Sequence, residues 1–165
     1  MKRGDIISGY ELVAQIAEGG MGTIWRARHP HLERQVALKF IRADVRDDES
    51  VREAFVREVK NLSRLHSPHI VQVTDSGFTD DGSPFMVTEY LEGEDLRARL
   101  ERERKLSIRD TLAIGIDVLK ALSEAHALGL IHRDLKPGNI FLQELAGGQA
   151  EAVKVLDFGV AKLIG

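Results

Sequence analysis

The sequence feature that most constrains the fold is a glycine-rich turn, AEGGMG, at residues 17–22, because a β-type segment lies on each side of it. YELVAQIA (10–17) precedes the turn and TIWRAR (23–28) follows it, and glycines permit tight-turn dihedral angles, so we expect a β-hairpin. A dinucleotide-binding fold would need a helix after the turn, and a GK[ST] phosphate loop would need a lysine, which excludes both. Two interpretations remain: a simple hairpin turn, or a hairpin whose backbone amides approach phosphate oxygens.

The next part of the chain predicts three more strands and one amphipathic helix. VALKFI (36–41) is apolar on both faces except for Lys39, so we expect it inside a sheet that is covered on both sides. Between residues 49 and 65, apolar side chains recur at helical spacing, and Glu58 falls inside their stripe. HIVQVTDSGF and FMVTEYL, separated by the turn DDGSP, complete a set of five strands.

After LEGED (91–95) the sequence pattern changes from predicted strands to predicted helices. A short charged helix at about 96–104 precedes a second helix, which Ser107 opens with Asp110 three residues later, and which Gly129 ends. We expect the buried face of this second helix to carry Ile108, Leu112, Leu119 and Leu122. Two short apolar strands, IFL and VKVL, follow and flank the loop QELAGGQAEA.

Lys39 and Glu58 are both charged where the pattern calls for an apolar side chain. A buried charge without a partner costs several kcal/mol, so each of the two is expected to pair with the other. In the alternative interpretation, Lys39 extends to the edge of the sheet and Glu58 lies at the margin of the helical stripe.

The segment LIHRDLKPGNIFL is the densest group of chemically useful side chains, since Asp134, Lys136 and Asn139 share one short loop between a helix and a strand. An ordinary capped turn is the simplest interpretation. Together with Asp157 at the end of another strand, however, the group offers an acceptor for a hydroxyl proton, a cation for a phosphate and two oxygen ligands for magnesium.

The order of AEGGMGTI, VALK, the helical Glu58, HRDLKPGN and DFG resembles the eukaryotic-type (Hanks-type) protein kinases, most closely the bacterial serine/threonine kinases. The resemblance implies an α+β, protein-kinase-like fold. Residues 1–91 would form an N-lobe with a five-stranded antiparallel sheet and one helix. Residues 92–165 would form an incomplete, mainly helical C-lobe that ends after DFG, without the activation segment and the remaining helices.

The resemblance also implies ATP and Mg²⁺ as cofactors and a role for each site residue. Asp134 would accept the proton of the substrate hydroxyl, Lys136 would lie near the transferred phosphoryl group, and Lys39, positioned by Glu58, would hold the α and β phosphates. Asn139 and Asp157 would bind the metal. The residues expected around the nucleotide are Ile16, Ala17, Glu18, Gly19, Gly20, Met21, Gly22, Ile24, Ala37, Lys39, Thr88, Glu89, Leu91 and Phe141.

Within that set, Gly19, Gly20 and Gly22 would cover the phosphates, and main-chain groups of Glu89 and Leu91 would bind the edge of the adenine. The adenine would lie between Ile16, Ile24, Ala37 and Phe141, with Thr88 guarding the back pocket. Ala17 departs from the family pattern because it replaces the first loop glycine, and its methyl group would add bulk beneath the ribose.

The function implied is phosphoryl transfer from Mg-ATP to serine or threonine hydroxyls of proteins. The alternatives are a nucleotide-binding fragment that regulates a partner without catalysis, an inert truncation product, and a small-molecule kinase, against which Lys136 argues. Relatives pack the apolar face of the helix from Ser107 to Leu128 against helices that this chain lacks, so we expect an exposed apolar patch and a protein partner that covers it.

The composition narrows the kinds of partner and the cellular locations that we expect. The formal net charge is −3 and basic residues are spread among acidic ones, so nucleic acid is not expected as a partner. The chain has no cysteine, which excludes disulfides and agrees with a cytoplasmic location, and no segment has the length and apolarity of a membrane span.

Overall fold

The computed structural model describes residues 1–19, 22–29, 31–41, 49–144 and 151–158. These residues form two compact units. The first contains the described residues of Met1–Ser63 and Gln72–Tyr90, and the second contains Arg64–Val71 together with residues 91–144 and 151–158. The described elements agree with the α+β class that the sequence predicts.

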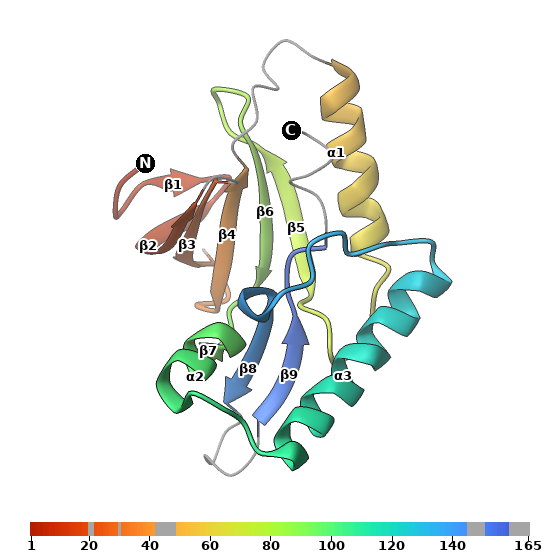
Figure 1. Cartoon of the computed structure of the whole chain (residues 1–165). Coiled ribbons are helices and arrows are strands. Elements are labelled where there is room, and N and C mark those ends of the chain that lie inside the picture. Colours follow the sequence, from red (N-terminus) through yellow and green to blue (C-terminus); the bar gives the residue numbers. More distant parts are fainter. Residues whose placement is uncertain (20–21, 30, 42–48, 145–150, 159–165) are drawn as a thin grey trace. The chain divides into compact units, whose positions relative to one another are not determined.

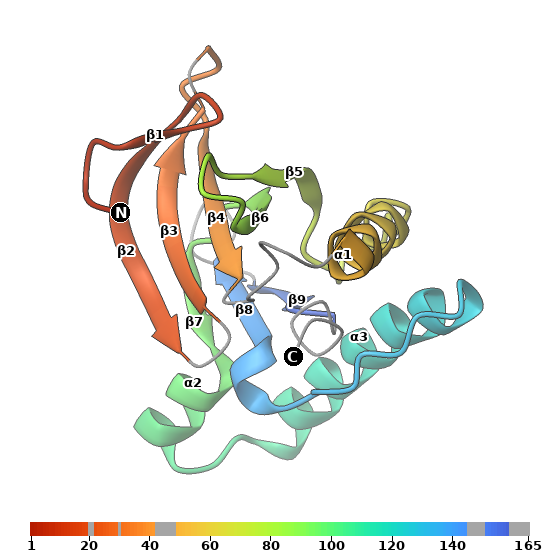
Figure 2. The ribbon, with the colours of Figure 1, turned by 90° about the horizontal axis from the view of Figure 1, so that it is seen from above.

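The first unit is an antiparallel sheet with one helix beside it. Its described strands follow the order β1-β2-β3-β4-β6-β5, and α1 (Glu49–Leu62) packs against β5 and β6, at the opposite edge from β1 (Figures 1 and 2). The five predicted strands are present, and a two-residue strand adds a sixth. The strands are β1 (Ile6–Ile7), β2 (Tyr10–Gly19), β3 (Gly22–Arg28), β4 (Gln35–Ile41), β5 (Val73–Phe78) and β6 (Pro84–Glu89).

One face of this sheet carries the core of the first unit. Alternate residues of four strands point to it, as the pleat requires, and they are Tyr10, Leu12, Trp25, Ala27, Val36, Leu38, Phe40, Phe85 and Val87. The side chains between them, including Arg26, Ala37 and Lys39, therefore lie on the other face of the sheet. Of the candidate nucleotide residues, Ile24, Ala37, Lys39 and Thr88 share this second face, whereas Glu89 follows Thr88 and points to the core face.

The second unit combines a small antiparallel sheet with helices. Its described sheet has the order β7-β8-β9, formed by β7 (Gly93–Asp95), β8 (Ile140–Glu144) and β9 (Glu151–Val155). The helices are α2 (Leu96–Glu103), α3 (Ile108–Ala127) and the 3-10 turn η1 (Pro137–Asn139). In Figure 1, α3 lies along β9 and α2 lies beside β7 and β8.

The segment 64–71 belongs to the second unit because its backbone is bonded to β9. The Val71 amide donates to the Val155 carbonyl at 3.1 Å, and the Val155 amide donates to the His69 carbonyl at 2.8 Å. Glu124 of α3 strengthens the attachment, since its carboxylate accepts the backbone amides of His66 at 2.6 Å and of Ser67 at 3.0 Å.

Gly93 lies where β7 comes very close to β8. Its φ angle is +136°, and a Cβ atom at this position would lie 2.1 Å from the Leu142 carbonyl oxygen. Only glycine fits, because both the backbone angle and the space exclude a side chain.

The boundaries of α3 agree with the sequence, but its buried face does not. Ser107 is the N-cap, with its hydroxyl accepting the Asp110 amide at 3.0 Å, and Gly129 follows the last turn with a φ of +74°. The side chains buried on this helix are Val118, Ala121 and Ala125.

The prediction that Ile108, Leu112 and Leu119 are buried is wrong, since they are 81%, 61% and 65% exposed, while Leu122 is half-buried. The small side chains of Ala121 and Ala125 let the helix lie close to the second unit's sheet, which turns the larger apolar residues outward. The exposed apolar patch that the resemblance implies is present on this helix, and it consists of Ile108, Leu112, Leu119 and Ile116, the last of which is 53% exposed. Among the described helices, none combines the length and apolarity needed to cross a membrane.

Candidate active site

The loop between α3 and β8 brings together three of the predicted site residues. The Asp134 carboxylate oxygen Oδ2 accepts a hydrogen bond from Lys136 Nζ at 2.8 Å and one from Asn139 Nδ2 at 3.2 Å. The same amide nitrogen of Asn139 also donates to the Asp134 carbonyl oxygen at 2.8 Å. The side chain of Asp134 is therefore held by a cation and an amide within a span of six residues.

Asn139 is largely buried, with 8% of its surface exposed. Both hydrogen bonds of its side chain are made by the amide nitrogen, so the amide oxygen is the atom that remains for another partner. An amide oxygen is a ligand that magnesium accepts. The backbone amide of Asn139 donates to the Lys136 carbonyl at 2.8 Å. This bond closes the η1 turn and fixes the backbone position from which the Asn139 side chain extends.

His132 is a further polar residue of this loop, and its residue type alone does not predict the contacts that it makes. It is buried, 3% exposed, and its Nδ1 atom accepts the Asp134 backbone amide at 3.3 Å while Nε2 lies 2.7 Å from the Leu156 carbonyl oxygen. Because an amide can only donate and a carbonyl can only accept, Nε2 carries the proton. The imidazole ring also packs against Phe158, with ring centroids 4.8 Å apart. The signal available in the sequence was a polar side chain inside the apolar run LIHRDL.

Asp157 is attached to the same loop through the main chain of Leu156. The Leu156 amide donates to the Asn139 carbonyl at 2.9 Å, and its carbonyl accepts from His132, so the residue before Asp157 is fixed at both ends. Asp157 itself is half-buried and has a φ of +55°, and Arg133 has a φ of +62°. Positive φ is uncommon outside glycine, and such strain accumulates at functional sites.

In the first unit, the glycine turn is a hairpin as predicted. Ala17 pairs with Ile24, Glu18 with Thr23, and Gly19 with Gly22. Gly22 has a φ of +136°, which favours glycine, and the space around Gly19 is open. Of the other predicted residues here, Ile16 is 48% exposed, whereas Gly20 and Met21 lie outside the described residues.

The other predicted nucleotide residues of this unit lie in neighbouring positions of the sheet. Lys39 is paired with Ile24 on β3 and with Met86 on β6, and Ala37 is paired with Thr88 on β6. Lys39 and Ala37 are both half-buried. A strand pair of this kind places its side chains on one face about 5 Å apart, so these residues are neighbours in the sheet, and their role in nucleotide binding stays a prediction.

The end of β6 is shaped by hydrogen bonds around Glu89. Its amide donates to the Gln72 carbonyl at 3.1 Å, and its carboxylate accepts the Gln72 amide at 2.9 Å. The Thr88 hydroxyl donates to the Glu89 carbonyl at 3.2 Å. Leu91 and Phe141, both half-buried, belong to the second unit, where Phe141 is paired with Asp95 and Lys154.

Glu58 lies on α1 and is half-buried, as a charged residue within an apolar stripe would be. The helix is held to the sheet by Phe55, whose ring centroid lies 5.5 Å from that of Phe78, and by the Arg52 guanidinium, 4.0 Å from the centre of the same ring. The pairing of Glu58 with Lys39 stays a prediction.

Among the described side chains outside the predicted set, those of Glu94, Arg102 and Tyr10 have displaced pKa values. Hydrogen bonds from Arg102 at 2.6 Å and from Arg99 at 2.5 Å hold the pKa of Glu94 below its usual range. Burial, followed by the hydrogen bond that its hydroxyl donates to Asp75 at 3.0 Å, raises the pKa of Tyr10 to about 12.

Comparison with known proteins matches residues 10–165 to the family model described as the protein kinase domain. The chain is 45% identical over 154 residues to serine/threonine-protein kinase pkn3 of Myxococcus xanthus, covering 93% of this chain and 28% of that protein. It is 38% identical over 159 residues to serine/threonine-protein kinase PknK of Mycobacterium tuberculosis, covering 96% of this chain and 14% of that protein.

Among solved structures, the PknI kinase domain of Mycobacterium tuberculosis superimposes with a TM-score of 0.83 at 30% identity, covering 97% of this chain and 62% of that one. The chain therefore spans less than a third of the length of these two curated relatives and less than two thirds of the solved kinase domain.

Proposed function

The chain belongs to the protein kinase domain family, and on this premise we propose that it is the nucleotide-binding and catalytic-loop part of a serine/threonine protein kinase. The observation that carries the proposal is the contact of Lys136 Nζ and Asn139 Nδ2 with one carboxylate oxygen of Asp134, at 2.8 and 3.2 Å. This arrangement combines a proton acceptor, a cation and an amide in one loop. The names of the relatives, all serine/threonine-protein kinases, favour the same acceptor class.

In the proposed reaction, the hydroxyl oxygen of a serine or threonine forms a bond to the γ-phosphorus of ATP, and the bond from that phosphorus to the bridging oxygen breaks to release ADP. Asp134 accepts the hydroxyl proton, which is worth roughly 10²- to 10⁴-fold in rate. Lys136, held at 2.8 Å from the same carboxylate, places a positive charge where the phosphoryl oxygens gain negative charge.

The residues present fit a magnesium ion of the kind that ATP carries. The amide oxygen of Asn139 and the carboxylate of Asp157 are hard oxygen donors, and the main chain of Leu156 connects them. When bound, magnesium neutralises phosphate charge. Among the described residues there is no group of three or more His, Cys, Asp or Glu side chains placed to hold a metal. Magnesium in phosphate sites needs only one or two protein ligands, so the pair is sufficient.

The first unit would hold the nucleotide. Lys39 would bind phosphate oxygens from a central strand of the sheet, and the hairpin of β2 and β3 would cover the phosphates with its backbone amides. Ala17 pairs with Ile24 in this hairpin. Its methyl group would reduce nucleotide affinity below that of a glycine variant.

The test is a paired measurement on the purified chain: binding of Mg-ATP by calorimetry, and transfer of labelled phosphate from ATP to a basic protein acceptor. We expect both to be observed. Asp134→Asn should bind nucleotide normally and lose transfer at least about 100-fold, since it removes the proton acceptor but keeps the side-chain shape. Lys39→Met should lose binding as well. Lys105→Met, at an exposed position between α2 and α3, is the control and should change neither.

Binding without transfer in the unaltered chain would favour the non-catalytic regulatory module over the enzyme, and absence of both would reject the two proposals together. Transfer that survives in Asp134→Asn would reject the role given to the loop. The use of magnesium is tested in the same assay by titrating the ion at constant ATP. A role in cytoplasmic signalling stays a proposal.

A further inference from the structure

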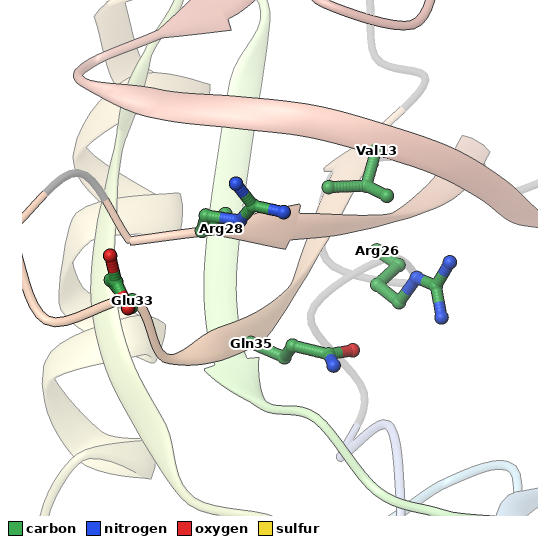
Figure 3. A pocket seen from close by; sticks show the side chains of 5 residues that line it. All are labelled: Val13, Arg26, Arg28, Glu33 and Gln35. Atoms are coloured by element: carbon green, nitrogen blue, oxygen red, sulfur yellow. The ribbon is translucent and has the colours of Figure 1, made fainter.

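A pocket lies on the face of the first unit's sheet that is opposite its core, and no predicted site residue lines it (Figure 3). Two arginines of β3, two residues apart and therefore on the same face, form one wall. On the neighbouring strand, β2, the pairing register with β3 shifts between Leu12 and Ala14, at the position of the pocket residue Val13. The residues that line the pocket are Val13, Arg26, Arg28, Glu33 and Gln35.

The sheet register brings the polar groups of this pocket together. Arg28 is paired with Gln35 across β3 and β4, and Arg26 is paired with Ala37, whose small side chain leaves room beside the guanidinium. Figure 3 shows both arginines extending from the same strand, with Gln35 on the next strand and Glu33 in the connection between them. The guanidinium of Arg26 also lies 6.0 Å from the centre of the Tyr90 ring, a cation–π contact that keeps it at the sheet.

The charges of the pocket are unbalanced. Two guanidinium groups face one carboxylate, that of Glu33, and neither arginine forms an ion pair with a carboxylate among the residues that the structure describes. The Nε atom of Arg26 is buried and has no hydrogen-bond acceptor within the described part of the chain. Proteins rarely leave such a donor unpaired, because its desolvation is not compensated. The unbalanced charge of the two guanidinium groups, and not the inaccessible Nε atom of Arg26, is what the pocket offers to an acceptor from outside the chain.

We propose that this pocket binds a phosphate group, with Arg26 and Arg28 as the principal donors and the amide of Gln35 as a third. Each guanidinium carries five N–H donors, so two of them from different residues offer more donors than one planar carboxylate can accept, whereas a tetrahedral phosphate has oxygens for both. Free phosphate and a phosphorylated serine or threonine share this chemistry. The site does not depend on the proposed function, because none of its residues takes part in nucleotide binding or transfer.

The test uses the unaltered chain labelled with ¹⁵N in its arginine side chains, without ATP or magnesium. Inorganic phosphate is added at constant ionic strength, and the Nε–Hε resonances are followed by NMR. We expect the Arg26 and Arg28 resonances to shift together and to saturate with one dissociation constant. O-phosphoserine is titrated in a second series. Tighter binding of O-phosphoserine would identify a phosphorylated side chain as the source, and tighter binding of the free ion would identify inorganic phosphate.

Substitutions in the pocket test which of its residues bind the phosphate. Arg26→Gln and Arg28→Gln should each weaken phosphate binding about tenfold or more, as expected for loss of a charged hydrogen bond. Glu33→Gln should strengthen it by removing a repulsive charge. Arg57→Gln, an exposed arginine on α1, is the matched control and should have no effect.

Three results would overturn the proposal. The first is a shift that does not saturate with either probe, and the second is unchanged binding in Arg28→Gln, which is exposed and should fold normally. The third is an equal affinity for acetate, which would show that the pocket does not prefer phosphate over a carboxylate.

Discussion

Replacing His132 with phenylalanine tests whether the two hydrogen bonds of its ring hold the catalytic loop. Phenylalanine keeps a ring that can pack on Phe158 but cannot accept the Asp134 amide or donate to the Leu156 carbonyl. Each of these main-chain groups would be left without its partner. An unsatisfied buried polar group costs about 1–3 kcal/mol, and the two groups here are partly buried, so we expect a loss of about 2–4 kcal/mol in total.

A loss of this size is large against the roughly 5–15 kcal/mol that stabilises a typical domain. It should be visible as a lower urea midpoint in far-UV circular dichroism. Hydrogen exchange gives a more local measurement, since the Asp134 amide should lose its protection in His132→Phe while the core amides of β4 in the first unit keep theirs. Phosphate transfer should also fall, because Asp134 is no longer oriented.

His126→Phe is the matched control for this substitution. His126 is exposed near the end of α3, so its replacement should change the urea midpoint little. The reasoning would be refuted if His132→Phe unfolded at the same urea concentration as the unaltered chain and if its Asp134 amide remained protected. Such a result would mean that the ring's packing, and not its hydrogen bonds, holds the loop.

Four further predictions concern stability and ionisation. Gly93→Ala should destabilise the second unit by several kcal/mol in urea unfolding, because its Cβ would lie 2.1 Å from a main-chain oxygen of β8 at a φ of +136°. Gly115→Ala, in the middle of α3 with open space around it, should instead stabilise by about 0.5–1 kcal/mol, and the opposite sign would contradict the argument. Asp75→Asn should lower the pKa of Tyr10 from about 12, as measured by phenolate absorbance. Since the folded pKa lies above the unfolded value of 10.0, the stability that Tyr10 contributes is present below about pH 10 and is lost as the pH rises toward 12. Ser107→Ala should cost about 1 kcal/mol by removing the N-cap of α3, and unchanged thermal unfolding would contradict it.

The longer elements of the fold could be predicted from the sequence because their hydrophobic periods are clear. The hairpin at the glycine turn, the strand that carries Lys39 and the helix that carries Glu58 all form where expected. The strands β1 and β7 contain two and three residues, too few for a period of two to be recognised. Only their hydrogen bonds to neighbouring strands define them.

The buried face of α3 could not be predicted because this helix is apolar on more than one side. Large side chains such as Leu112 and Leu119 dominate a count of hydrophobic residues, yet Ala121 and Ala125 are the fully buried ones. Which face packs inward depends on how closely the helix can approach its neighbours, and small residues decide that. Tertiary packing, and not helical periodicity, determines which face of α3 is buried.

The sequence predicts that the polar side chains of the catalytic-loop segment lie together, but it gives no signal for the contacts that the main chain makes. Asp134, Lys136 and Asn139 have recognisable donors and acceptors within six residues, and their contacts follow. The role of His132 depends on two backbone groups far apart in sequence. Aspartate is enriched at positive φ among the non-glycine residues, but most aspartates adopt ordinary angles, so residue type alone does not predict the φ of Asp157.

The double attachment of Leu156 has a consequence for how variation at this position would be read. Both of its ties to the loop, at 2.9 Å and 2.7 Å, use peptide atoms that every amino acid except proline supplies. A saturation mutagenesis scan would therefore report on the half-buried side chain of Leu156 and, proline apart, would leave both of these ties in place. Only proline, an amide-to-ester replacement, or a one-residue insertion that shifts the strand would reveal that the loop and the strand end are joined there.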